Sequence, residues 1–343
     1  MIFRQMFDSV SSTYTYVMAS RIGGEALIID PVFEKTDQYL TLLEQLELKL
    51  VKVIDTHVHA DHITAMDSLR DKTNCITVMG EQAPVDVVSM RVSDGETINI
   101  DGIKLTAMYT PGHTSNSYCF HGEGRIFTGD TLLIKGTGRT DFQNGDPELQ
   151  YDSLFNKVLN LPEQTLVYPG HDYKGHTVST LGEEKAFNPR LQVTSKAEYV
   201  EIMNNLNLPN PIMMDVAVPE NMNMGLRLEK QIQVPSLEVA SLLSQGQDNF
   251  YIVDLREDNE RAKSGFIPSA HHLPYSGLDR HLDTLKTTDA PIVFYCAVGE
   301  RSAMAVSIAL ASGVKNVMHL VGGFAAYKDI ANPFLRKTNN FNE

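Results

Sequence analysis

The sequence predicts an α/β chain that folds into two domains, and three features support this prediction. The chain has 343 residues, which is long for one domain and sufficient for two separate cores. Apolar runs in roughly its first two thirds each end in a histidine or an aspartate, and strand-like and helix-like segments alternate in the remainder. Between these parts, residues 209–235 are rich in proline, methionine and asparagine and lack sustained periodicity. We therefore expect one domain at residues 1–228 and another at 229–343.

The composition restricts the classes of partner. A net charge of −14 and an isoelectric point near 5.2 argue against a general nucleic-acid surface and against an anchor on anionic membranes. Residues 1–10 contain no basic region followed by an apolar core, and no stretch approaches the ~20 apolar residues of a membrane span. Three cysteines are too few and too scattered for a disulfide framework. We therefore expect a cytoplasmic protein with no nucleic acid and no membrane partner.

The first domain begins with short extended runs. Residues 14–18 and 26–29 flank a Gly23-Gly24 turn signal, which predicts an antiparallel start to a sheet. Residues 36–46 place their apolar side chains largely on one face of a helix, and residues 50–54 read as the next, buried strand.

A histidine-rich stretch follows that buried strand and precedes a segment with helical spacing. Residues 56–62 read Thr-His-Val-His-Ala-Asp-His, so one strand-to-helix loop carries four candidate metal ligands. Imidazoles and carboxylates suit zinc, iron or manganese. The candidate ligands are His57, His59, Asp61 and His62.

Three further strand ends carry ligands of the same kind. A run at 104–109 leads to His113, a run at 125–129 leads to Asp130, and a run at 165–169 leads to His171. One such residue alone is more often a turn aspartate or a hydrogen-bonded core histidine, but their joint occurrence predicts a shared metal site. The set can hold two zinc ions bridged by Asp130 and a hydroxide, as in a hydrolase. It can equally hold one Fe(II) on two histidines and one carboxylate, with open positions for a thiol and dioxygen. Ligand types alone leave both options open.

The second domain alternates helices and strands. Residues 236–244 and 301–312 read as helices, and residues 250–253 and 291–295 read as strands. This alternation predicts a small domain with a parallel sheet.

One cysteine in this domain has the surroundings of a nucleophile. Cys296 follows a predicted strand and directly precedes a predicted helix, where backbone N–H groups favour the thiolate. Gly299 permits a tight loop, and Arg301 adds a cation near an anionic sulfur donor, so we expect Cys296 and Arg301 to be catalytic. Cys75 and Cys119 lie in apolar runs, and we expect both to be inert buried residues.

The ligand set resembles that of the metallo-β-lactamase fold, an αββα sandwich. Residues 59–64, 133–143 and 215–222 are similar to the persulfide dioxygenases of that fold, which oxidise glutathione persulfide with O2 to glutathione and sulfite at a mononuclear iron. This resemblance implies one Fe(II) per chain, bound by His57, His113 and Asp130. It also implies a polar surround, or alternative metal ligands, formed by His59, Asp61, His62 and His171.

A further likeness concerns the substrate. Arg139 and Tyr173 stand where the related glutathione-thioester hydrolases bind the tripeptide, which implies contacts to glutathione. Thr137 departs from the persulfide dioxygenase pattern, since many members carry cysteine there, but this removes no ligand. The alternative is a dinuclear hydroxyacylglutathione-type thioesterase with Zn(II) as its metal.

Residues of the second domain resemble a rhodanese, or sulfurtransferase, domain over roughly residues 230–335. The resemblance implies that Cys296 carries a persulfide, while Asp254 and Arg256 are scaffold. Phe266 replaces a frequent histidine, and Ala297 replaces a frequent basic residue, which is expected to weaken binding of thiosulfate-like anions.

Together the two resemblances imply a fusion of a persulfide dioxygenase with a rhodanese. Its partners would be glutathione persulfide, glutathione, thiosulfate and O2, and a homodimer is one option for its assembly. A different class is a non-oxidative sulfur carrier or sensor, in which Cys296 holds a persulfide for a partner and the first domain only binds metal.

Overall fold

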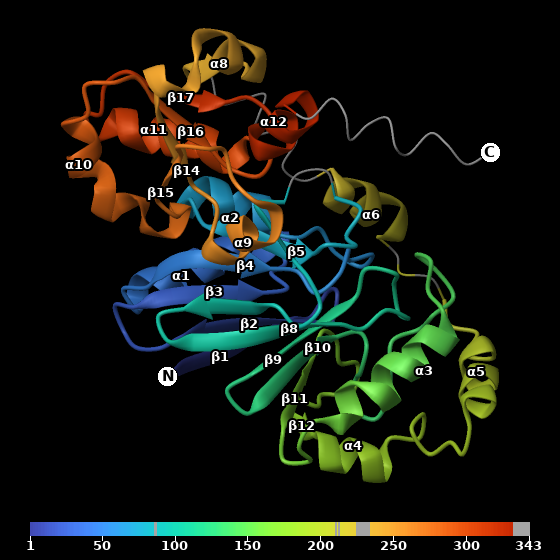
Figure 1. Ribbon diagram of the computed structural model, residues 1–343. Coiled ribbons are helices and arrows are strands. Elements are labelled where there is room, and N and C mark those ends of the chain that lie inside the picture. Colours follow the sequence, from blue (N-terminus) through green and yellow to red (C-terminus); the bar gives the residue numbers. More distant parts are fainter. Residues whose placement is uncertain (86–87, 210, 212, 224–233, 332–343) are drawn as a thin grey trace, which may run out of the picture. The chain divides into compact units, whose positions relative to one another are not determined.

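The computed structural model describes residues 1–85, 88–209, 211, 213–223 and 234–331 (Figure 1). The chain divides into two compact units, Met1–Met224 and Gly225–Glu343. The boundary expected between residues 228 and 229 lies outside the described residues. Among those residues, every helix is too short or too polar to span a membrane.

The first unit contains a mixed sheet whose strands lie side by side in the order of the sequence. Its strands are β1 (Ile2–Asp8), β2 (Thr13–Ala19), β3 (Glu25–Ile29), β4 (Lys49–Ile54), β5 (Ile76–Gly80) and β6 (Met90–Val92). The pairs β1/β2 and β2/β3 are antiparallel, which confirms the predicted start, and the later pairs are parallel. Strand β1 was not expected from the sequence, because its half-buried side chains do not alternate regularly.

A second sheet completes this unit. Its order is β12 (Ser179–Thr180), β11 (Leu166–Pro169), β10 (Arg125–Gly129), β9 (Tyr118–Gly122), β8 (Ile103–Tyr109) and β7 (Thr97–Ile100). Only β10/β11 is parallel among its pairs in the described chain. The two sheets face one another through aromatic side chains, since Phe127 of β10 lies 5.0 Å from Tyr16 of β2 between ring centroids.

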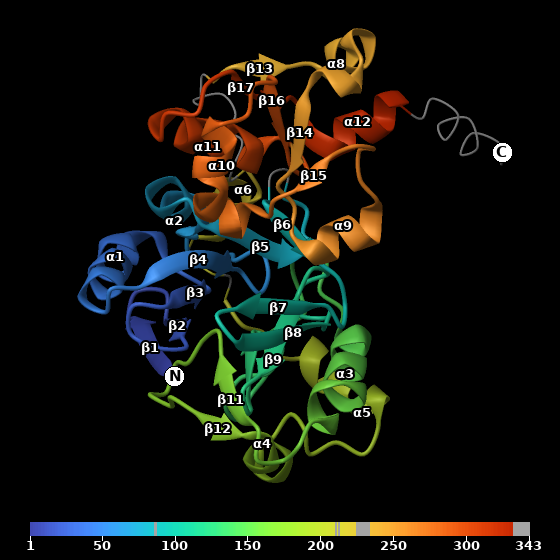
Figure 2. The same ribbon diagram turned by 60° about the vertical axis from the view of Figure 1, so that its left-hand side comes forward.

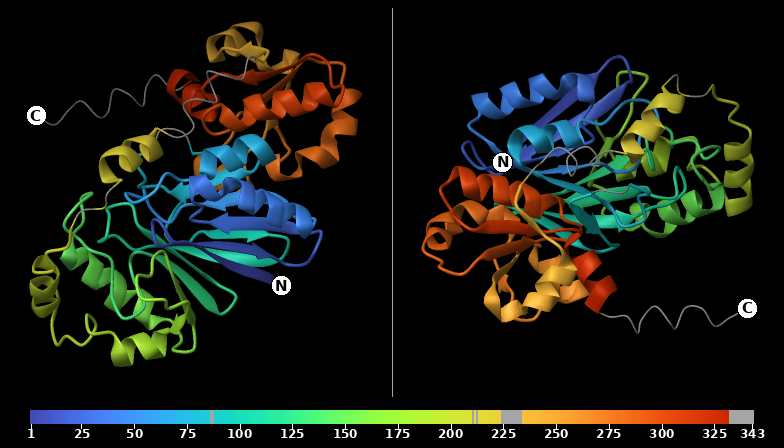
Figure 3. Two further views of the ribbon diagram at one scale, coloured as in Figure 1. Left: turned by 180° about the vertical axis from the view of Figure 1, so that it is seen from behind. Right: turned by 90° about the horizontal axis from the view of Figure 1, so that it is seen from above.

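Helices cover the outer faces of both sheets (Figure 2). α1 (Thr36–Gln45) and α2 (Met66–Thr73) bury Tyr39 and Leu69 against the first sheet. α3 (Pro147–Asn156), α4 (Leu181–Phe187) and α5 (Lys196–Asn204) bury Leu154 and Tyr199 against the second. The layers therefore run helix, sheet, sheet, helix, and the predicted αββα sandwich is confirmed (Figure 3).

One helix lies inside the stretch that the sequence pattern marked as a boundary. α6 (Met214–Met222) has Pro219 within it and packs Val218 and Met222 against the core of α1 and α2. The lack of sustained periodicity in residues 209–235 therefore gave no sign of this helix. Its mixed composition hid the helix, because only a few side chains face the core.

The second unit has a sheet whose pairs are all parallel among the described residues, in the order β13 (Ser236–Leu237), β17 (Val317–Leu320), β16 (Ile292–Tyr295), β14 (Tyr251–Asp254) and β15 (His271–His272). Its helices are α8 (Val239–Gln245), α9 (Asp258–Ser264), α10 (Leu282–Lys286), α11 (Glu300–Ala311) and α12 (Gly323–Ala331). Short 3-10 helices span Phe33–Lys35 and Val158–Asn160 in the first unit and Gln247–Asn249 and Tyr275–His281 in the second.

The prediction of a parallel α/β sheet in the second domain is confirmed, with one correction. Ser236 and Leu237 pair with β17 and so begin a strand, not the expected helix.

Gly80 tests the packing between the two sheets of the first unit. A Cβ atom at Gly80 would overlap the ring of Tyr118, which comes from the other sheet and donates its hydroxyl to Gln82 Oε1. We expect Gly80→Ala to destabilise the first unit by about 2 kcal/mol, because the close-packed ring cannot move freely. Differential scanning calorimetry measures the loss. Gly136→Ala is the matched control, since its Cβ would meet only Leu133 Cβ at 4.0 Å. Equal unfolding temperatures for the two variants would contradict this account.

Candidate functional site

The loops that follow β4, β8 and β10 bring three candidate ligands together. His57, His113 and Asp130 each offer one ligand atom, and these atoms lie within 4.8 Å of one another. His113 Nε2 is 3.5 Å from Asp130 Oδ2, and the rings of His57 and His113 meet edge to face at 5.0 Å. The two histidines are 2% and 4% exposed. The group is a compact, buried set of two imidazoles and one carboxylate.

Hydrogen bonds fix which ring nitrogens face the cluster. His113 Nδ1 lies 2.7 Å from the carbonyl oxygen of Arg139, which only accepts, so Nδ1 carries the proton. Thr56 donates its hydroxyl to Asp30 Oδ2, so its oxygen accepts from His57 Nδ1 at 3.0 Å. Both Nε2 atoms therefore keep a free lone pair, which is the form that binds a metal.

The charges of the three groups fit a divalent cation. Burial, reinforced by His59 and His113, holds the pKa of His57 well below its usual value, and burial likewise lowers the pKa of His113. Burial opposes the charge of Asp130, but His171 and His113 hold its pKa below the usual range. Two neutral imidazoles beside an ionised carboxylate suit Fe(II) or Zn(II).

The remaining candidates form an adjoining network. His171 bridges two carboxylates, with Nδ1 2.7 Å from Asp130 Oδ1 and Nε2 2.8 Å from Asp61 Oδ2. Burial disfavours its charge, yet Asp130 and Asp61 raise its pKa well above the usual value. Asp61 Oδ2 also lies 2.8 Å from His62 Nδ1 and accepts from the Thr13 hydroxyl. Thr13 was not identified from the sequence, because a threonine in a strand carries no signal of this role.

His59 turns toward a second acidic group. Its Nε2 lies 3.2 Å from Asp30 Oδ1, and Asp55 approaches within 4.0 Å. Burial opposes its charge, but Asp30 raises its pKa to about 9, while burial raises the pKa of Asp55 to about 7. Among described residues, His59 Nδ1 and His62 Nε2 are buried without a hydrogen-bond partner. His59, His62 and Asp61 form a further group in which each residue offers one ligand atom and these atoms lie within 4.8 Å of one another.

Asn221 holds the histidine-rich loop from α6. Its Nδ2 donates to the carbonyl oxygens of His59 and His62, and its Oδ1 accepts from Thr64 N at 2.9 Å. The residue is 2% exposed, so all three bonds are shielded from water. Sequence reasoning gave no role to Asn221, although it lies in the stretch 215–222 that resembled the persulfide dioxygenases.

The two expected glutathione contacts lie in different surroundings. Arg139 forms a bidentate ion pair with Asp141 and donates to the carbonyl oxygens of Leu208 and Pro209, so its donors are engaged within the chain. Tyr173 is exposed, and its ring runs parallel to that of His171 at 6.1 Å. The proposed contacts of both residues to glutathione stay predictions.

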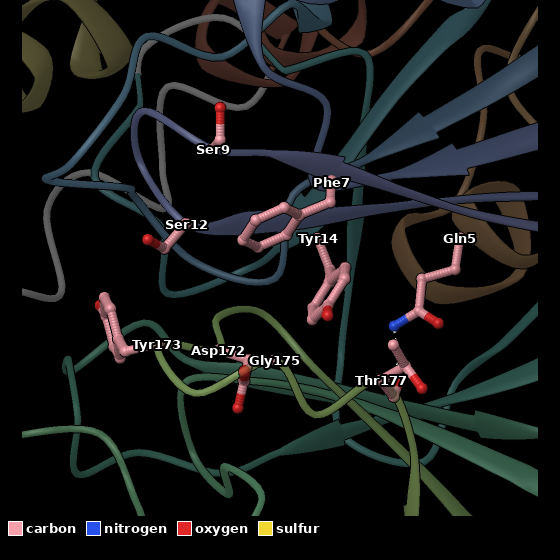
Figure 4. A pocket seen from close by; sticks show the side chains of 9 residues that line it. All are labelled: Gln5, Phe7, Ser9, Ser12, Tyr14, Asp172, Tyr173, Gly175 and Thr177. Atoms are coloured by element: carbon pink, nitrogen blue, oxygen red, sulfur yellow. Dashed lines mark hydrogen bonds between the residues drawn. The ribbon is translucent and has the colours of Figure 1, made fainter.

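A cavity of about 520 Å³ opens beside Tyr173 (Figure 4). Tyr14 contributes an aromatic wall and donates its hydroxyl to His176 O, while Gln5 Nε2 donates to Thr177 O. These bonds tie the loop after His171 to β1 and β2. The lining consists of Gln5, Phe7, Ser9, Ser12, Tyr14, Asp172, Tyr173, Gly175 and Thr177.

In the second unit, Cys296 lies at the end of β16, just before α11. It is 1% exposed, and its Sγ accepts from Gly299 N at 3.2 Å. Gly299 has φ of 105°, a conformation that favours glycine, so the loop turns back over the sulfur. Cys75 and Cys119 are also buried thiols, as expected, and burial raises the pKa of Cys119 to about 11.

The arginines near this loop are held in ion pairs. Arg301 meets Glu260 of α9 through two bonds of 2.6 and 2.7 Å, and Arg256 meets Asp254 through Nε and an η nitrogen. Tyr295 donates its hydroxyl to Asp254 as well. The arrangement of Asp254 and Arg256 agrees with the scaffold role expected for them. The catalytic role expected for Arg301 stays a prediction.

Known proteins resemble both units. Residues 9–85 and 79–171 match the metallo-beta-lactamase superfamily, and residues 237–330 match the rhodanese-like domain. The chain is 42% identical over 229 residues to the human mitochondrial persulfide dioxygenase ETHE1, covering 66% of this chain and 89% of that protein. It is 28% identical over 243 residues to a probable hydroxyacylglutathione hydrolase of Schizosaccharomyces pombe, covering 60% and 91%. The crystal structure of ETHE1 from Myxococcus xanthus matches with 47% identity and a TM-score of 0.64, covering 66% of this chain and all of that one.

The likeness to the human persulfide dioxygenase covers 89% of that protein, and the rhodanese-like match lies after the metallo-beta-lactamase match in the chain. The chain belongs to the persulfide dioxygenase family of the metallo-beta-lactamase superfamily and carries a rhodanese-like domain after it.

Proposed function

We propose that the first domain oxidises glutathione persulfide with O2 at one Fe(II), and that the second transfers sulfur between thiosulfate and glutathione through a persulfide on Cys296. The oxidation consumes one persulfide, one O2 and one water and yields glutathione and sulfite. The observation that carries the proposal is the buried cluster of His57, His113 and Asp130 in a chain of this family.

The residues of the cluster fit a ferrous ion. His57 and His113 would present Nε2, and Asp130 would present a carboxylate oxygen. Bound there, Fe(II) supplies electrons for dioxygen chemistry and open positions for a thiol and dioxygen, whereas zinc has no accessible redox change. The choice of iron over zinc rests on the likeness to the persulfide dioxygenases.

The other residues hold this set in place. Arg139 O and Thr56 Oγ1 keep each ring in the tautomer that leaves Nε2 available. His171 restrains Asp130, so a carboxylate oxygen stays directed at the two rings. Burial keeps bulk water away from the reacting sulfur.

A dinuclear zinc thioesterase is the alternative for the first domain. It is less supported, because the hydroxyacylglutathione hydrolase relative is 28% identical whereas the persulfide dioxygenase is 42% identical. A homodimer and a cytoplasmic location stay predictions.

Oxygen uptake tests the first activity. Protein purified without oxygen and loaded with Fe(II) is expected to consume O2 on addition of glutathione persulfide and to release sulfite. We expect His113→Ala to lower this rate by about 100-fold or more, because one ligand is lost. An unfolding temperature of the first unit equal to that of the wild type provides the folding control. Zinc in the protein as isolated, thioester hydrolysis, and no O2 uptake after iron loading would favour the thioesterase.

Cys296→Ser separates the two activities. The variant is expected to lose sulfur transfer entirely, since a hydroxyl cannot carry the sulfane sulfur, and to keep O2 uptake within about twofold of the wild type. Thiocyanate formation and an oxygen electrode measure the two rates. Loss of both activities in a folded variant would contradict independent sites.

Asn221→Ala tests the hold of α6 on the metal loop. Removing the amide leaves two buried carbonyls and one N–H without partners, so we expect roughly 10- to 100-fold weaker iron binding. Competition with a chromogenic chelator measures the affinity. Asn223→Ala is the matched control, because Asn223 is exposed and, among the residues that the structure describes, its side chain donates to Pro219 O of its own helix turn. Equal iron affinity in both variants would show that the hydrogen bonds of Asn221 to the histidine-rich loop do not contribute to iron binding.

A further inference from the structure

The charge around Cys296 suggests which sulfur donor the second domain prefers. Arg301 follows the cysteine loop on α11, yet its guanidinium is 1% exposed and gives two bonds to Glu260 of α9. The side chain of Glu260 is itself only 10% exposed. The positive charge of Arg301 is therefore matched by a carboxylate held against it, with little water to screen the pair.

The other charged groups described near this loop are acids or arginines that lie close to acids. The loop itself, residues 296–300, reads Cys-Ala-Val-Gly-Glu and carries an acid but no base. Arg256 is bound to Asp254 and lies 4.0 Å from the ring centre of Phe324, and Arg261 Nε lies 3.9 Å from the same aspartate. The arginines packed around this loop are thus compensated by acids.

The two proposed donors differ in how much charge they bring to the reacting sulfur. With thiosulfate, the Cys296 thiolate attacks the outer sulfur, the S–S bond to the sulfonate breaks, and sulfite leaves with the electron pair. The two negative charges of thiosulfate then approach the negative charge of the Cys296 thiolate in the transition state. With protonated glutathione persulfide, the thiolate attacks the terminal sulfur and the glutathione thiolate leaves, so a single negative charge is present at the reacting atoms throughout. Like charges at contact distance repel strongly in a buried site.

We infer that the Glu260–Arg301 ion pair makes Cys296 discriminate against thiosulfate and accept sulfur preferentially from persulfides, with Glu260 as the specificity-determining residue. This inference rests on the proposed sulfurtransferase function and names its preferred substrate class. Glu260 acts through Arg301, so it is a positioning residue and does not touch the donor.

The donor half-reaction can be measured by itself on the full chain. Protein is mixed without oxygen, so that the first domain cannot consume the persulfide, with either thiosulfate or glutathione persulfide. Acid quenching followed by mass spectrometry of the peptide that contains Cys296 gives the second-order rate constant for gain of one sulfur atom. The quantity of interest is the ratio of the two rate constants, and Cys296→Ser gives the background.

Glu260→Gln removes the compensating charge and keeps an oxygen that accepts from Arg301. We expect it to raise the thiosulfate rate constant by about five- to tenfold and to change the persulfide rate constant by less than about twofold. Asp258→Asn is the matched control, because it removes a charge from the same helix at an exposed position. Its ratio is expected to equal that of the wild type.

Ala297→Lys provides a second route to the same result if the first variant fails to fold. It adds a cation one residue after Cys296 and leaves Glu260 and Arg301 in the sequence, and it is expected to shift the ratio in the same direction. A wild-type protein that reacts with thiosulfate as fast as with glutathione persulfide would overturn the inference, as would unchanged ratios in the folded variants. A protein whose Cys296 gains sulfur from neither donor would instead overturn the proposed sulfurtransferase function.

Discussion

A buried carboxylate, Asp30, organises the candidate metal centre without belonging to its innermost set. It directly follows β3, and because β3 and β4 are parallel, it meets the residues that follow β4. Its Oδ1 accepts from Thr56 N and lies near His59 Nε2, and its Oδ2 accepts from the Thr56 hydroxyl. Through Thr56 it sets the ring of His57. Asp30 itself has φ of 51°, which turns the chain at the point where the carboxylate is needed.

The same geometric rule operates in both units. The carboxyl ends of parallel strands lie at one edge of a sheet, so residues distant in sequence meet there. In the first unit this rule brings Asp130 at the end of β10 close to His171 at the end of β11. In the second it sets Asp254 at the end of β14 beside the residue that precedes Cys296 at the end of β16. Two unrelated chemistries thus use one feature of α/β architecture.

Features that depend on the residues at the ends of strands could be predicted from the sequence. A shared metal site followed from apolar runs that stop at ligand-type residues, and the parallel second domain followed from alternating helices and strands. The αββα sandwich and the choice of His57, His113 and Asp130 as the innermost set came from the resemblance to known families. The partners of long side chains did not follow, because a guanidinium can reach many groups and local pattern does not select one. Glu260 lies 41 residues from Arg301, and Arg139 reaches carbonyls near residue 208. α6 was missed for a related reason, since Asn221 faces the metal loop with a polar group where a helix usually buries an apolar one.

The position of Asn221 has a practical consequence for dividing the chain. A proline-rich, aperiodic stretch is the usual place to cut between domains, and residue 209 is where that stretch begins. A fragment ending there would contain every candidate metal ligand and still lack the amide that ties the loop of His59 and His62. The carbonyl oxygens of Leu208 and Pro209, which accept from Arg139, would lie at the cut end of such a fragment. Faithful isolation of the first catalytic unit requires a fragment that extends through residue 223.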